Sequence, residues 1–357
     1  MTTTLPLYEL KFEKADLKKL ERDVWSKSPV PAKISIEQAL YDIEIRYRGS
    51  YTRKLKKKSY QIDFILPDTD HRPSEIHLNA EAFDPSHFRN KLSLDFMRDL
   101  GIHTPESQHI FLTQDGNPLG LYLKLESVNE LYLKSRNLPR GTIYYAVNNK
   151  ADFSQKKKRG LTSGYQRKLG KMQDDHHLIH FIKMINIKSR SSFQQEIPQL
   201  LNIENYFIWL AGAVCTMNND GFTHNYALYR NGDDRLFNII PWDYDATFGR
   251  KVNGEVMDWD YVPITGKDTN KLTTQLMKAS GYRRLYKRIL EEILETKFTV
   301  EYLEETVMDL HATLRPYVLM DPHFMTNINL YDEEPSFIFQ FIKDRNAFLK
   351  RQLAFLK

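Results

Sequence analysis

Four side chains that could do acid–base or metal chemistry lie within a short stretch of the chain: Asp220, Asn225, Asp243 and Asp245. Carboxylates and a carboxamide suit a hard cation such as Mg2+, which usually takes one or two protein carboxylates and leaves its other positions to water and substrate phosphates. This combination indicates metal-assisted phosphate chemistry. Asn and Asp are also turn formers, so some of these residues could instead only shape loops.

A predicted β-hairpin holds most of this set together. Within residues 224–240, two runs rich in Tyr, Leu, Phe and Ile flank an Asn-Gly-Asp-Asp turn, a strong hairpin signal. Pairing about that turn would place Asn225 opposite Ile240 and Asp243 opposite Phe222. The open end of the hairpin would then gather the polar side chains.

The segment before the hairpin predicts a buried helix. Residues 203–217 (IENYFIWLAGAVCTM) are too long for a typical strand and apolar nearly all round. Such a helix would anchor the loop that carries Asp220.

The spacing of these residues resembles that of the protein kinase fold, in which a catalytic Asp is followed by a metal-binding Asn and, after a hairpin, a metal-binding Asp. More narrowly, NNDGFTHNYALYRN followed by PWDYDATFG resembles the CotH-type family of atypical protein kinases. The resemblance extends from Tyr41 through the hairpin. It implies an α+β, two-lobed fold, with a mostly β small lobe over residues 1–126 and a mostly α large lobe over 127–357.

The resemblance also implies roles for the polar set. Asp220 would orient or deprotonate the acceptor hydroxyl, while Asn225 and Asp243 would hold Mg2+, or Mn2+ in its place, across the phosphates of ATP. Asp245 would either bind metal as well or only structure its loop. The chain departs from ordinary kinases in having Asn219 in place of the Arg of His-Arg-Asp, and Tyr and Asp in place of Phe and Gly after Asp243.

Nucleotide contacts are expected in the first third of the chain. Residues 41–48 alternate as a strand, a Gly-Ser-Tyr-Thr turn follows, and residues 59–66 predict a second strand. Arg48 and this turn could cover phosphates or form a plain turn, because the glycine-rich fingerprint is incomplete. The resemblance implies that one lysine of the KLKKK run pairs with phosphate, and its position in the family's KKSY pattern favours Lys58, with Lys57 next; a solvated basic edge is the alternative.

A helix should follow, with Asp84 as its N-cap, Pro85 at its first position and Gly101 after its end. By analogy with kinases it could supply the acidic partner of the lysine. The candidates Asp95, Asp99 and Glu81 compete, and the sequence favours none of them.

Two further strands, 107–113 and 119–126, should complete the small lobe around a turn at 115–118. Glu126 is then a candidate contact at the hinge beside adenine, or an ordinary carboxylate at a strand end. Trp242, just before Asp243, could stack on adenine or simply pack in the core.

The remainder of the chain is predicted to be mostly helical. Apolar faces recur from residue 282 to 293, from 303 to 314 before Pro316, and in a last helix over 337–356. Residues 149–170, which include the basic run 156–159, are expected to form a polar surface loop that could attract acidic groups.

Composition bounds the class of protein. With 357 residues, 41% hydrophobic and 27% charged, the chain can bury a sizeable core. A net charge of +5 is too small to imply a nucleic-acid partner, and no stretch predicts a membrane span. A single cysteine, Cys215, indicates a reducing compartment, so we expect a cytoplasmic protein. The family resemblance implies that the protein is made in the mother cell of a sporulating bacterium and later lies in the spore coat.

The function predicted on these grounds is an ATP-dependent protein serine kinase that uses Mg2+. Family resemblance suggests basic, serine-rich spore coat proteins as substrates. One alternative is a metal-dependent phosphohydrolase in which Asp220, Asp243 and Asp245 hold a metal that activates water. The other is a non-enzymatic coat scaffold with a degenerate kinase fold. Substrate identity and oligomeric state stay open.

Overall fold

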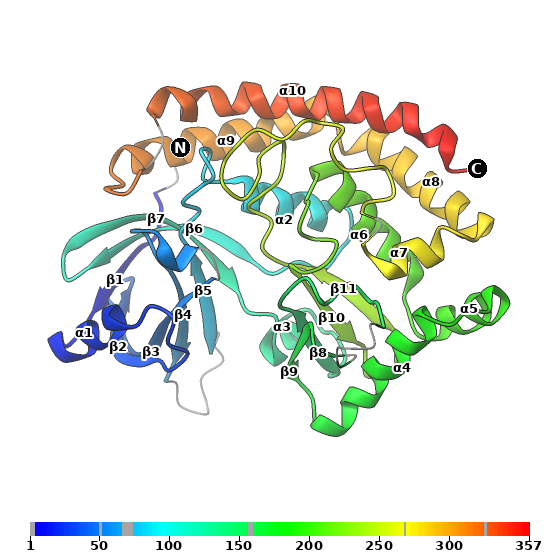
Figure 1. Ribbon diagram of the computed structural model, residues 1–357. Coiled ribbons are helices and arrows are strands. Elements are labelled where there is room, and N and C mark those ends of the chain that lie inside the picture. Colours follow the sequence, from blue (N-terminus) through cyan, green and yellow to red (C-terminus); the bar gives the residue numbers. More distant parts are fainter. Residues whose placement is uncertain are drawn as a thin grey trace. The chain divides into compact units, whose positions relative to one another are not determined.

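The structure is a computed structural model that describes residues 4–49, 52–65, 74–155, 160, 162–267, 269–324 and 327–357 (Figure 1). The basic run 156–159, Ser50 and Tyr51 of the predicted phosphate-covering turn and Leu66 of the second predicted strand lie outside these residues. Two compact units form. The barrel unit comprises Met1–Lys91, Pro105–Ser127 and Thr306–Pro335, and the helical unit comprises Leu92–Thr104, Val128–Glu305 and Ser336–Lys357.

The units are interleaved along the chain, because helices α2, α9 and α10 each begin in one unit and end in the other. The division into a nucleotide-covering lobe over residues 1–126 and a second lobe over residues 127–357 stays a prediction. The strand-rich N-terminal part and the helical C-terminal region confirm the predicted α+β class.

Seven strands of the barrel unit close into a barrel in the order β1-β2-β3-β4-β5-β7-β6. Their bounds are β1 Leu7–Lys11, β2 Val30–Ile36, β3 Ala39–Arg48, β4 Ser59–Phe64, β5 Glu75–Asn79, β6 Ser107–Gln114 and β7 Asn117–Glu126. The predicted alternation is present in β3, where Ile43, Ile45 and Tyr47 are buried in the barrel core while Asp42 and Glu44 are exposed. Helix α1 (Lys14–Arg22) and a short 3-10 turn (Thr52–Lys54) complete this part.

Two-residue turns set the register of this barrel. Glu37 and Gln38, both with positive φ, join β2 to β3, and Asp115 with Gly116 joins β6 to β7 in the same way. Positive φ at both central residues is the signature of the hairpin turn that matches strand twist. The predicted turn at 115–118 is therefore shorter than expected, and Pro118 lies within β7.

Helix α2 begins later than predicted, at Arg89, and ends at Asp99. Asp84 is not the N-cap of a helix that starts at Pro85, because His87 has a φ of +59°, which breaks the helical path. Instead, the Asp84 carboxylate accepts hydrogen bonds from the backbone N–H groups of Ser86 (2.9 Å) and Arg89 (2.8 Å).

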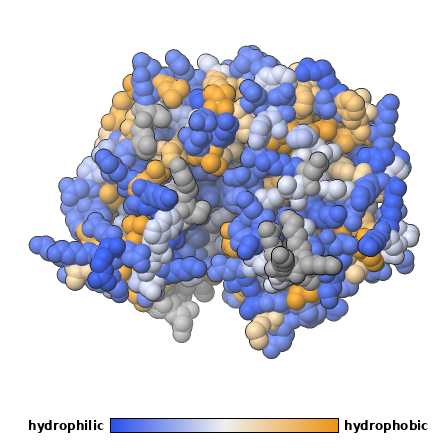
Figure 2. All heavy atoms as spheres, viewed as in Figure 1, coloured by the Kyte–Doolittle hydropathy of each residue, from blue (hydrophilic) through white to orange (hydrophobic). Residues whose placement is uncertain are grey.

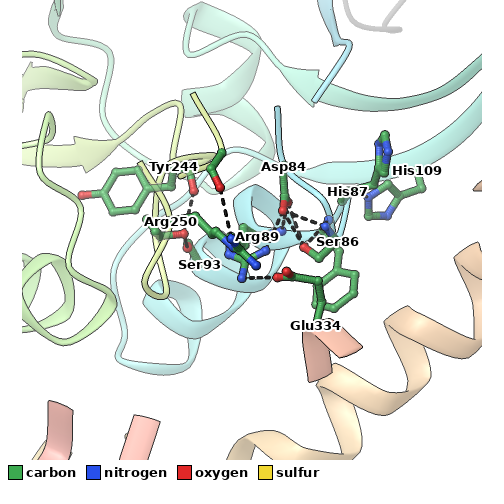
Figure 3. A network of polar contacts seen from close by, with 12 residues as sticks. Asp84, Ser86, His87, Arg89, Ser93, His109, Tyr244, Arg250 and Glu334 are labelled. Carbon is green, nitrogen blue, oxygen red and sulfur yellow. Dashed lines mark hydrogen bonds and ion pairs between the residues drawn. The ribbon is translucent and has the colours of Figure 1, made fainter. Parts of the chain in front are cut away.

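A buried ion cluster fixes the start of α2 (Figure 3). The Arg89 guanidinium is fully buried between Asp84, at 2.7 Å from Nη1 to Oδ1, and Glu334 of α10. Burial alone would raise the pKa of Asp84, but Arg89 and neighbouring donors hold it below its usual value. Removing one member would leave an unpaired charge in the core.

The helical unit is built on a four-stranded sheet in the order β11-β10-β8-β9. These strands are β8 Thr142–Ala146, β9 Tyr165–Leu169, β10 Tyr226–Arg230 and β11 Phe237–Pro241. Its helices are α3 Glu130–Ser135, α4 Asp175–Ile185, α5 Arg190–Glu196, α6 Ile203–Thr216, α7 Lys271–Leu276 and α8 Ser280–Thr296. The predicted loop over 149–170 contains β9, a short charged strand at the sheet edge that lacks the usual apolar alternation.

The last two helices are longer than predicted. Helix α9 (Val300–Leu319) contains Pro316, and α10 (Ile328–Gln352) contains Pro335 and begins well before residue 337. A helix-interior proline removes one backbone hydrogen bond, yet the apolar faces on either side continue, with Val307, Leu314 and Val318 buried in α9.

In the described residues no helix combines the length and the apolar composition that crossing a bilayer requires. On the face shown in Figure 2, hydrophilic residues predominate and apolar residues are scattered among them.

Candidate catalytic site

The loop that carries Asp220 begins where α6 ends. Met217 closes the helix in the left-handed conformation, with a φ of +57°, and turns the chain toward Asn218. The Asn218 side-chain oxygen accepts from the Gly221 N–H at 2.9 Å, and the Asp220 carbonyl accepts from the N–H groups of Thr223 and His224, each at 3.2 Å. This tight turn leaves the Asp220 side chain half-buried. The predicted buried helix and its anchoring role are confirmed, because most of α6 is inaccessible to solvent.

Asn270, which sequence reasoning missed, ties this loop to two helices. Its side chain is fully buried; Nδ2 donates to the Phe222 carbonyl at 2.9 Å, and Oδ1 accepts from Tyr206 Oη at 3.2 Å and from the Thr273 N–H at 3.0 Å. Asn270 thus caps α7 while it fixes the backbone two residues after Asp220. A lone Asn in a loop gives no sequence signal for such a role.

The hairpin forms as predicted, but its register differs. Tyr226 pairs with Pro241 and Ala227 with Ile240, so the expected pairing of Asn225 with Ile240, and of Asp243 with Phe222, is wrong. The physical reason is a longer loop: the strands end at the Arg230–Phe237 pair, and the Asn231 N–H donates to the Leu236 carbonyl at 3.0 Å. A shift of two residues keeps every side chain on its face.

The new register brings Asn225 and Asp243 together. The Trp242 N–H donates to the Asn225 carbonyl at 3.0 Å, and Asn225 Nδ2 donates to the Asp243 carbonyl at 3.1 Å. Both residues have left-handed backbones, with φ values of +58° and +60°, a conformation that Asn and Asp tolerate better than other side chains. Strained φ at both positions indicates that the surrounding fold holds them there.

The chemistry of this pair fits a hard divalent cation. Both side chains are half-buried, and the amide contact of Asn225 uses its nitrogen, which leaves the hard Oδ1 oxygen for a cation. Across the described part of the chain, no three His, Cys, Asp or Glu side chains come together as a metal-binding group. The carboxylates of Asp220, Asp243 and Asp245 accordingly do not form such a group.

The neighbours of Asp243 are held by the core. Tyr244 is buried and its hydroxyl accepts from the Trp209 indole N–H of α6 at 2.9 Å. Trp242 is 9% exposed and its ring lies 5.4 Å from that of Tyr145, so one side of the indole is already packed. Asp245 is half-buried. The roles of Trp242 and Asp245 stay predictions.

The other predicted nucleotide contacts belong to the barrel unit. Arg48 Nη1 donates to Asn79 Oδ1, Lys58 Nζ donates to the Arg53 carbonyl, and Glu126 Oε2 accepts from the Glu106 N–H at 2.9 Å. Their roles toward a nucleotide stay predictions.

Lys57, rather than Lys58, is the buried lysine of this segment. Its ammonium contacts Asp321 Oδ2 at 2.6 Å and the Leu121 carbonyl at 2.5 Å. Burial would raise the pKa of Asp321, but Lys57 and the N–H groups of Leu121 and His323 hold it below its usual value. Asp321 lies so far along the chain that no local signal could have identified it; it was not among the acidic candidates of the sequence.

An α+β chain that carries this Asp, Asn and Asp set on a loop and hairpin after a buried helix is a kinase-like protein. The chain belongs to the CotH kinase protein family, whose match covers residues 45–349. Both the fold class and the family resemblance expected from the sequence are thereby confirmed.

Two curated relatives come from Bacillus subtilis (strain 168). Inner spore coat protein H is 46% identical over 360 residues, which cover 99% of this chain and 99% of the relative. Inner spore coat protein H-like protein is 25% identical over 304 residues, which cover 84% of this chain and 87% of the relative.

Among solved structures, the Helicobacter pylori proinflammatory kinase CtkA matches with a TM-score of 0.34 and 8% identity over 90% of this chain and 92% of its own. A chain from the Shewanella oneidensis MR-1 toxin–antitoxin complex of HipA, HipB and operator DNA matches with a TM-score of 0.43 and 12% identity, over 97% of this chain and 74% of that chain.

Proposed function

We propose that this chain is an ATP-dependent protein serine kinase. The observation that carries the proposal is the placement of Asp220, Asn225 and Asp243 within one unit of a CotH kinase family member, with Asn225 bonded to the Asp243 backbone. All three side chains are half-buried and so keep some access to solvent.

In the proposed reaction, the oxygen of a serine hydroxyl attacks the γ-phosphorus of ATP. A new O–P bond forms, the bond from the γ-phosphorus to its bridging oxygen breaks with its electron pair passing to ADP, and the hydroxyl proton passes to Asp220. Asn225 and Asp243 would hold Mg2+, or Mn2+, which supplies charge neutralisation on the phosphates. The contribution of the protein is positioning plus fixed electrostatics.

We assign the remaining predicted residues to nucleotide binding. Lys58, or Lys57 in its place, and Arg48 would meet phosphates, while Glu126 and Trp242 would meet adenine. Asp245 either adds a metal ligand or shapes the loop. These assignments rest on the family resemblance, with residues 1–126 as the nucleotide-covering lobe and 127–357 as the lobe that carries the catalytic loop.

For substrates we propose serines of basic, serine-rich spore coat proteins. The support is the 46% identity to inner spore coat protein H of Bacillus subtilis. The chain would then act in the cytoplasm of the mother cell and afterwards lie in the spore coat.

Incubation of the purified chain with γ-labelled ATP, Mg2+ and a basic, serine-containing peptide tests the proposal. We expect label on the peptide, and less than a tenth of that signal from the Asp220→Asn and Asp243→Asn variants. Release of labelled phosphate without peptide labelling would favour a phosphohydrolase. Nucleotide binding without either product, in Mg2+ and in Mn2+, would favour a scaffold.

A further inference from the structure

Lys267 lies on a loop that packs against the Asp220 loop, near enough for the charge of Asp220 to act on its ammonium. Gly266 lies so close to Phe222 that a Cβ at Gly266 would come within 2.5 Å of the Phe222 ring. The Lys267 carbonyl accepts from the Asn270 N–H at 3.0 Å, and Asn270 in turn holds the Phe222 carbonyl. The position of Lys267 is therefore coupled to the backbone that presents Asp220.

The backbone around Lys267 is held firmly on its other side as well. The Gly266 N–H donates to the Pro263 carbonyl at 2.9 Å, and the buried Tyr286 hydroxyl of α8 donates to the Ile264 carbonyl at 2.6 Å. A fixed backbone reduces the freedom of the side chain it carries, which is a requirement for a group that must meet a substrate atom.

The Lys267 ammonium itself has no polar partner in the described part of the chain. It forms no ion pair and no side-chain hydrogen bond with those residues, and its Nζ lies 5.8 Å from the centroid of the Tyr261 ring. Burial lowers the pKa of Lys267, and the negative charge of Asp220 acts in the opposite direction. Two opposite charges thus influence each other without pairing.

This arrangement leaves the half-buried Lys267 ammonium able to bind an anionic ligand, because part of its desolvation is already complete and no protein acceptor among the described residues competes for it. Among the residues that the structure describes, the Asp220 carboxylate accepts one long side-chain hydrogen bond, from Asn219 Nδ2 at 3.4 Å. A group that offers an anionic oxygen to Lys267 and a hydroxyl proton to Asp220 would satisfy both side chains. A phosphoryl group in transfer to a hydroxyl has these two features.

We propose that Lys267 is a further catalytic residue, whose ammonium donates hydrogen bonds to the oxygens of the transferred phosphoryl group while Asp220 holds the acceptor hydroxyl. This inference rests on the proposed kinase function. It assigns the stabilisation of charge in the transition state to a lysine of the helical unit, separate from the lysines of residues 54–58.

The test compares Lys267→Met, Lys267→Arg and Lys251→Met. Lys251 is the matched control, because it lies in the same long segment but is exposed and paired with Glu255 at 3.3 Å. We expect Lys267→Met to lower kcat about hundredfold, as loss of one preorganised donor does, with an unchanged KM for ATP. Lys267→Arg should restore part of the rate, Lys251→Met should match the unmodified chain, and all melting temperatures should agree.

A second readout needs no turnover. Thermal stabilisation by Mg2+ and ADP is compared with and without aluminium fluoride, which mimics a phosphoryl group in transfer. The unmodified chain should gain an additional rise in Tm that Lys267→Met loses and Lys251→Met keeps.

The outcomes separate the two proposals. If the unmodified chain transfers phosphate and Lys267→Met transfers equally fast, the role of Lys267 is refuted while the kinase function stands. If the unmodified chain transfers no phosphate, the kinase function is refuted. In that case, an equal effect of aluminium fluoride on the Tm of all variants would also refute the anion-binding role of Lys267. An effect that only Lys267→Met loses would support that anion-binding role.

Discussion

At the scale of residues, the two carboxylates of the site have different surroundings and should have separable roles. Asp220 sits in a turn whose backbone is bonded independently of its side chain, whereas Asp243 lies directly against Asn225. Residue types and spacing were sufficient to predict that Asn225 and Asp243 lie together at the open end of the hairpin, because a shift of register by two residues keeps both at that end. The roles of Asp220, Asn225 and Asp243 stay predictions. Lys267 and Asn270 were missed, since lone Lys and Asn residues in loops are common for reasons unrelated to catalysis.

Replacing each carboxylate should therefore affect a different step. Asp243→Asn removes charge from the proposed cation site, so Mg2+-dependent binding of ATP should weaken at least tenfold. Asp220→Asn should leave that binding within twofold and slow transfer instead. Calorimetric titration of ATP with and without Mg2+ measures binding, and equal ATP affinity in both variants would refute this division of roles.

At the scale of elements, the loop that carries Asp220 depends on α6 before it and α7 after it. Asn270 joins the two through Tyr206, Thr273 and the Phe222 carbonyl. The helix α6 was predictable from its apolar length, and the hairpin from its turn residues. The register was not, because an Asn-Gly signal does not fix how many residues the loop contains.

Asn270→Ala should lower the free energy of unfolding by about 1–3 kcal/mol, because it leaves buried polar groups unpaired. Asn270→Asp is the sharper variant: it keeps an acceptor for the Thr273 N–H at the start of α7 but loses the donor to the Phe222 carbonyl. We expect that variant to slow phosphoryl transfer and to lose stability as well, because its buried carboxylate would face the Phe222 carbonyl without a donor between them. Urea unfolding and kcat measured on both variants would check this, and an unchanged kcat in Asn270→Asp would contradict it.

At the scale of the whole molecule, segments distant in sequence complete the barrel unit. Lys57 meets Asp321, and Arg89 meets Glu334, only because residues 306–335 belong to the same unit as the barrel strands. Local sequence patterns predicted four of the barrel strands, β3, β4, β6 and β7, but not β1, β2 or β5, and not the closure of the barrel. These long-range pairs could not be predicted, because neither partner carries a local signal. The helix expected before Pro316 continues through it, and the last helix begins earlier than expected.

The barrel unit should lose stability in mild acid. Burial lowers the pKa of His87 to about 4 and that of His109 to about 3, from 6.5, with the Lys57 charge adding to the effect at His87. Because both folded-state values lie below the unfolded value, the unfolded chain binds more protons. Stability is therefore greatest above pH 6.5 and falls as the pH drops toward 4.

Denaturant unfolding at pH 7 and pH 5 measures how the free energy of unfolding changes with pH, with His109→Gln as the test variant. Since His109 Nε2 contacts the His87 carbonyl at 2.9 Å, the Gln amide keeps a polar group there without titrating. The variant should have a shallower pH dependence than the unmodified chain. Identical slopes would show that buried histidines do not set the acid sensitivity.

The central claim is phosphoryl transfer dependent on Asp220, and the most direct measurement is mass spectrometry of a basic, serine-containing peptide after incubation with the chain, ATP and Mg2+. The account predicts phosphoserine with the unmodified chain and at least a hundredfold slower appearance with Asp220→Asn, at equal melting temperature. Phosphoserine formed at the same rate by both proteins, or by neither, would contradict it.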